Sequence, residues 1–165
     1  MGIFPWPASH LLLPATSAPS AEAAARSLLL GDLDAEVPDA WRFFVAAARG
    51  LTAEALGWLE GDDAVTRYDR FVLAPTAAGL DQIESAGDPT LACLARCAAF
   101  VQGVADDLPE ESLLDGELLA IRLLTSAVAR IERGRPAEAC GTLQLAAAAA
   151  AATSPVLAAV AEMQV

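Results

Sequence analysis

The 165-residue sequence contains a single histidine, His10, and this scarcity limits the chemistry that the protein can perform. Ser–His and Cys–His nucleophile pairs and histidine-ligated metal sites cannot be assembled from one histidine in a proline-rich stretch. We also find no glycine-rich phosphate loop after a strand. We therefore expect no enzymatic activity, no catalytic residues, no cofactor and no metal.

Basic residues are few as well. All ten are arginine, none is lysine, and 22 acidic residues bring the net charge to −12. A nucleic-acid surface needs a basic stripe to neutralise phosphates, and no run of arginines forms one. We therefore exclude nucleic acid as a partner, and the negative charge helps to keep an apolar chain in solution.

Aromatic residues make up only 5% of the chain, although 55% of it is hydrophobic. Alanine and leucine supply most of the difference, and both favour helices, whereas strand-favouring Ile, Tyr and Thr are scarce. The composition predicts an all-α fold. A chain of this length can bury a substantial core.

Cysteine is present in an odd number, and no positively charged leader precedes an apolar stretch, so we expect reduced thiols and a cytoplasmic protein. Cys93 and Cys97 lie four residues apart and share one helical face. They could be a thiol pair for redox sensing or metal binding, or small core residues. We favour the core interpretation for both and for Cys140.

One uncharged stretch, from Ala139 to Ala161, is long enough to cross a bilayer. It consists mostly of alanine, and Gln144, Thr153 and Pro155 interrupt it. We interpret it as two buried helices, so we consider contact with a membrane unlikely.

Two regions are expected, a proline-rich apolar arm over residues 1–20 and an all-helical domain over residues 21–165.

The acidic stretch of residues 106–117 could hold a divalent cation, but it lacks the residue spacing of a calcium-binding loop. We therefore interpret it as a solvated loop. The expected helices cover about 21–30, 40–49, 52–60, 63–73, 75–86, 89–105, 117–133, 136–152 and 155–165.

A short pattern occurs three times, with glycine at Gly50, Gly87 and Gly134, then Thr or Pro two residues later and Ala five residues later. The glycines are 37 and 47 residues apart. Glycine permits the left-handed turn that reverses a chain after a helix. The pattern predicts three antiparallel helical hairpins, with Ala92 and Ala139 buried where the helices cross.

The third unit resembles the tetratricopeptide repeat family. That family has bulky, small, small, bulky and small residues at five positions, which are occupied here by Leu123, Ala127, Ala139, Leu143 and Ala146. Arg130 and the unequal spacing depart from its pattern. Over about residues 38–152 the resemblance implies stacked antiparallel helical hairpins, and a non-repetitive helical bundle is the alternative.

These features favour a non-enzymatic protein-interaction or regulatory module that presents a helical-repeat surface to a protein partner or to another copy of itself. The alternative is a small-molecule sensor or carrier with an apolar pocket between Ala-rich helices. The candidate binding residues are arginines on an inner helix wall and an aromatic in the arm: Arg42, Arg49, Arg122, Arg130 and Trp6. Solvated helix faces and local ion pairs are the simpler explanation of the arginines, and covering the core of its own chain is the simpler explanation of the arm.

Overall fold

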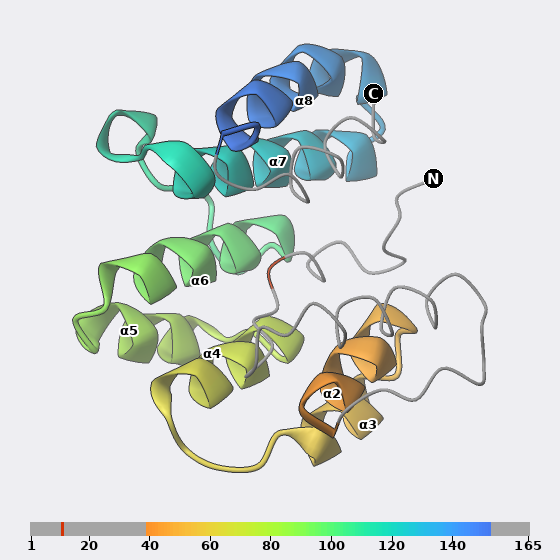
Figure 1. The fold of residues 1–165 in the computed structure, drawn as a ribbon, viewed down its shortest axis with the longest axis vertical. Helices are drawn as coiled ribbons and strands as arrows, with labels where there is room; N and C mark the ends of the chain where they lie inside the picture. Colours follow the sequence, from red (N-terminus) through yellow and green to blue (C-terminus); the bar gives the residue numbers. More distant parts are fainter. Residues whose placement is uncertain (1–10, 12–38, 153–165) are drawn as a thin grey trace. The chain divides into compact units, whose positions relative to one another are not determined.

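The computed structural model describes Leu11 and residues 39–152. Within these residues the chain forms seven α-helices and one short 3-10 helix and no strand, which confirms the all-α fold (Figure 1). The expected helices at 21–30 and 155–165 lie outside the described residues. The observed helices are α2 (Asp39–Ala48), α3 (Thr52–Trp58), α4 (Ala64–Leu73), α5 (Ala77–Ser85), α6 (Pro89–Val101), η2 (Glu111–Leu113), α7 (Gly116–Glu132) and α8 (Pro136–Ala150).

The described residues belong to two compact units. One contains Leu11 with α2, α3 and α4, and the other contains α5, α6, η2, α7 and α8. In the second unit α5 packs on α6, α6 on α7 and α7 on α8, so each helix contacts the next in sequence.

The three glycines of the repeated pattern each end a helix and turn the chain into the next one. Gly50, Gly87 and Gly134 have φ angles of 77°, 84° and 74°. They join α2 to α3, α5 to α6 and α7 to α8, and the helices of each pair pack together. The predicted glycine turns are therefore confirmed.

Side-chain caps fix the start of three helices. The carboxylate of Asp63 accepts hydrogen bonds from the backbone of Val65 and Thr66 at the start of α4. Thr76 and Asp88 cap α5 and α6 in the same way. Helix α3 differs, because its first residue is Thr52 and Leu51 precedes it without a side-chain hydrogen bond.

The core of the second unit lies where α7 contacts its neighbours. Leu123, Leu124, Ala127, Ala139 and Leu143 are buried together, and Ala146 completes this cluster. Ala139 was predicted to be buried, which is confirmed, because it has no exposed surface. Ala92 was predicted to be buried too, but it is only half-buried at the start of α6.

The apolar residues at helical spacing along α7 do not form a single buried stripe. Leu124 is buried, whereas Leu118, Ile121 and Val128 are half-buried. Ala129, which does not share this spacing, is buried. The reason is that α7 lies between α6 and α8 and therefore buries two sides, which a single-stripe pattern does not anticipate.

The described residues include no helix that is both long and apolar enough to cross a membrane. The helix from Pro136 ends at Ala150, before the uncharged stretch does.

Candidate functional site

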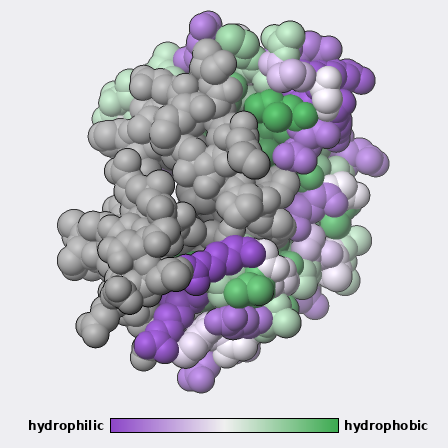
Figure 2. Space-filling view, turned by 90° about the vertical axis from the view of Figure 1, so that its right-hand side faces the viewer, coloured by the Kyte–Doolittle hydropathy of each residue, from purple (hydrophilic) through white to green (hydrophobic). Residues whose placement is uncertain are grey.

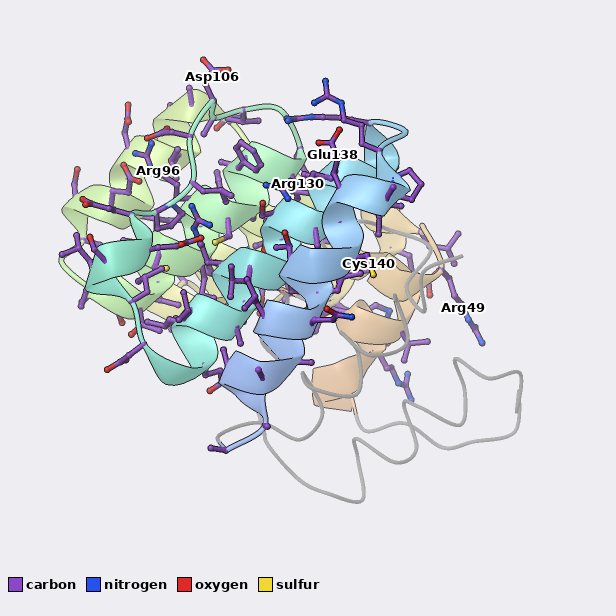
Figure 3. The ribbon with its side chains drawn as sticks, turned by 90° about the horizontal axis from the view of Figure 1, so that it is seen from above. Arg49, Arg96, Asp106, Arg130, Glu138 and Cys140 are labelled. Atoms are coloured by element: carbon purple, nitrogen blue, oxygen red, sulfur yellow. The ribbon has the colours of Figure 1, made fainter. Side chains whose placement is uncertain are left out.

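Two of the arginines predicted to bind a partner use their guanidinium groups within the chain. Arg122 donates from Nε to the carbonyl oxygen of Pro109, 3.0 Å away, and pairs with the Glu111 carboxylate. Arg130 donates from Nη1 to the Glu138 carbonyl at 3.0 Å and to the Thr142 hydroxyl at 2.8 Å. Figure 3 shows Arg130 and Glu138 side by side on α7 and α8. Arg122 is therefore in a local ion pair, whereas Arg130 binds two neutral oxygens of its own chain.

The other two predicted arginines lie in the first unit and are exposed. The guanidinium of Arg42 lies over the ring of Trp58, 4.9 Å from its centre, and so ties α2 to α3. Arg49 points away from the ribbon (Figure 3). Trp6, the fifth candidate, lies outside the described residues.

An arginine that sequence reasoning did not select holds the acidic segment in place. Arg96 on α6 makes a two-pronged contact with the Glu84 carboxylate on α5, through Nε at 2.7 Å and Nη2 at 2.8 Å. Its Nη1 also donates to Asp107 at 2.9 Å. With Arg122 bound to Glu111, two arginines pair with carboxylates of the acidic stretch. Asp107 and Glu111 still expose 72% and 53% of their side chains, as expected of a solvated loop. The signal available in sequence was Arg96 itself, the one charged residue within the apolar stretch of residues 89–101.

The thiols of α6 form a cluster with α7. Cys97 is buried and Cys93 is half-buried, so the expectation that both are core residues is wrong for Cys93, and Cys140 is also half-buried. The Cys97 thiol is hydrogen-bonded to the Cys93 sulfur, and this bond, with help from the Arg122 charge, lowers the pKa of Cys93 against the opposing effect of burial. The same bond and burial raise the pKa of Cys97 well above its ordinary value.

One residue of the apolar arm, Leu11, is buried, with 1% of its surface exposed. Its carbonyl oxygen accepts a 2.7 Å hydrogen bond from the hydroxyl of Tyr68 on α4, which is itself fully buried. At this position the arm covers the core of its own unit, which agrees with the alternative that the arm covers its own chain and does not bind a partner there.

The outward side of α8 carries no charge over two turns. We call this stripe the α8 outer face; its residues are all exposed and are Gly141, Gln144, Leu145 and Ala148. Leu145 exposes 62% of its surface, although most leucines of this unit pack inward. On the side of the molecule shown in Figure 2, hydrophobic areas are small and lie among hydrophilic ones. An uncharged helical stripe is therefore a candidate contact surface in a strongly acidic chain.

No group of three or more His, Cys, Asp or Glu side chains suited to a metal occurs among residues 39–152. Comparisons with protein-family models, with curated proteins and with solved structures found no match. The contacts described above are therefore the basis for assigning a function.

Proposed function

We propose that this chain is a non-enzymatic interaction module that binds a protein partner through the α8 outer face. The observation that supports the proposal is the exposure of Leu145 within a stripe that lacks charge. Because the chain as a whole carries a net charge of −12, an uncharged stripe is the part of its surface least costly to remove from water.

The small side chains of this stripe suit an apolar helix of the partner. Gly141 and Ala148 flank Leu145 and let another backbone approach closely, while Leu145 offers a side chain to insert. Burying one leucine contributes about 1.5–3 kcal/mol, enough to influence affinity strongly. The partner surface should therefore be apolar.

The arrangement of the second unit supports this mode of binding. Each helix from α5 to α8 packs on its neighbour in the chain, and α8 is the last described member. In helical repeat proteins each helix pair contacts its neighbours and leaves an outer side available for binding. We propose a tetratricopeptide-like use of this stack, in which an apolar helix of the partner packs on the α8 outer face.

Arginine recognition of an acidic partner is not part of this proposal. The guanidiniums of Arg122 and Arg130 already bind acceptors of their own chain. Recruiting them would leave those acceptors unpaired. Binding through Arg49 stays a prediction.

The proposal is tested by placing a charge in the stripe. Leu145→Glu should weaken binding of the captured and purified partner at least about tenfold, or 1.4 kcal/mol, measured by calorimetry. Leu113→Glu is the matched control, because Leu113 is also an exposed leucine, at 79%, but belongs to η2 and not to α8. It should leave affinity unchanged, and both variants should melt as the original protein does.

Two results would overturn the proposal. One is equal affinity for both variants and the original protein. The other is a purified protein that binds only a small molecule, as native mass spectrometry would show. Sedimentation equilibrium with the same pair of variants distinguishes a second copy of the chain from a different protein as the partner.

A further inference from the structure

We propose that the first unit binds a short acidic segment of another protein, one that also carries an apolar side chain, on a surface that we call the α2–α3 face. The residues of this face are all exposed and are Arg42, Arg49, Leu51 and Trp58. The inference does not rest on the α8 outer face, which belongs to the other unit. It assigns a binding site and a ligand chemistry to residues that the proposed function does not use.

The packing of α2 on α3 brings these residues together. Arg42 and Arg49 are about two helical turns apart and therefore share one side of α2. The guanidinium of Arg42 lies 4.9 Å from the centre of the Trp58 ring, which places the end of α3 beside the start of α2. Leu51 follows Arg49 in the turn between the two helices. Each end of the face thus has one arginine and one apolar side chain.

The positive charge of this face is unusual in a chain with a net charge of −12. The side chain of Arg49 is exposed and points away from the ribbon (Figure 3), whereas Arg96 and Arg122 pair with carboxylates of their own unit. At physiological salt, charges more than about 10 Å apart are largely screened, so the local arginines decide what approaches this face. A short acidic segment is therefore complementary to it in charge.

The apolar side chains of the face define the second requirement on the ligand. Leu51 exposes 48% of its surface and Trp58 exposes 40%. Because the Arg42 guanidinium stacks on the ring, the Trp58 side chain is already ordered, and less freedom is lost on binding. Tryptophan and arginine are also the residue types that dominate binding energy at protein interfaces. The acidic segment should therefore carry an apolar side chain as well.

A carboxylate of α3 decides how such a segment lies on the face. Glu54 is exposed in the first turn of α3 and repels a second carboxylate placed above it. The guanidinium of Arg49 offers paired N–H donors that match a carboxylate. We therefore place the ligand carboxylate at Arg49 and the apolar side chain on Leu51 and Trp58.

The test uses a synthetic probe of this chemistry. The probe is a fluorescein-labelled peptide of about ten residues, in which two glutamates are followed by two leucines and the rest are glycine and serine. Its anisotropy should rise saturably with the original protein at about 0.15 M salt, with a dissociation constant below about 1 mM. Two matched peptides, with glutamine for each glutamate or serine for each leucine, should bind at least about fivefold more weakly.

Variants of the protein locate the site. Arg49→Glu should weaken binding of the probe about tenfold, because attraction becomes repulsion. Arg67→Glu is the matched control, since Arg67 is an exposed arginine of the same unit, lies on α4, and changes the net charge equally when reversed. It should leave the affinity unchanged. Trp58→Ala should also weaken binding about tenfold. If Trp58→Ala does not fold, as circular dichroism would show, Arg49→Glu and the matched peptides decide.

Any of three results would overturn the inference. They are no saturable rise with the original protein, equal affinity for the glutamate and glutamine peptides, and the same affinity for the probe in Arg49→Glu and Arg67→Glu. An original protein that does not bind the probe but self-associates until Arg49 is reversed would assign the face to a second copy of the chain instead.

Discussion

Replacing Ala139 with leucine tests the packing of the second unit directly. Ala139 has no exposed surface and lies in the cluster formed by Leu123, Leu124, Ala127 and Leu143. A leucine at this fully buried position adds volume between α7 and α8, so we expect α8 to move away from α7 or side chains to leave their preferred rotamers. Such overpacking costs about 1–3 kcal/mol.

Urea unfolding followed by circular dichroism measures this cost. We expect Ala139→Leu to lower the midpoint without changing the slope of the transition, since the surface exposed on unfolding is nearly the same. The matched control is Ala148→Leu on the same helix. Ala148 is exposed, and leucine is nearly as good a helix former as alanine, so the stability should change by less than about 0.5 kcal/mol.

Ala92→Leu provides an intermediate case. Ala92 is half-buried at the first turn of α6, and the leucine side chain can extend toward solvent. Equal effects of the substitution at positions 139 and 148 would refute the reasoning, because α8 would then not bury Ala139 against α7.

Two further predictions concern the first unit. Tyr68→Phe should destabilise the protein by about 1–3 kcal/mol, measured by urea unfolding, because it leaves the buried Leu11 carbonyl without its hydroxyl donor; an unchanged midpoint would mean that the arm is not anchored there. Hydrogen bonds, chiefly from the Thr66 side chain, hold the pKa of Asp63 below its ordinary value of 3.8. The stability from this carboxylate is therefore present above that value and is lost as the pH falls through the lower folded pKa. Asp63→Asn keeps the helix cap but does not titrate. The unfolding midpoint of this variant should therefore depend less on pH between about 5 and 2 than that of the original protein. The same dependence of the midpoint on pH in both proteins would contradict the lowered pKa of Asp63.

Features fixed by neighbours in the chain were predictable from sequence. Gly134 follows α7 and precedes Pro136, and this order alone indicates a left-handed turn followed by a helix start. The fold class followed from the abundance of alanine and leucine. Each of these properties depends on interactions within a few residues, so the sequence displays them directly.

The contacts and the exposure of the candidate site residues could not be predicted from the sequence. The sequence placed Arg122 and Arg130 on helices, but it did not show that each would bind oxygens of its own chain 8–13 residues away. It presented Cys93 and Cys97 as equivalent, while the helices packed around α6 bury one and leave the other accessible.

The contact between Leu11 and Tyr68 could not be predicted from the sequence either. The carbonyl of Leu11 and the hydroxyl of Tyr68 that donates to it are 57 residues apart in the chain. The sequence by itself determined the all-α fold and the positions of the three glycine turns, since residue preferences and local backbone angles decide these. Tertiary structure alone decided which arginines, thiols and apolar residues stay accessible, because burial depends on which distant surfaces pack together.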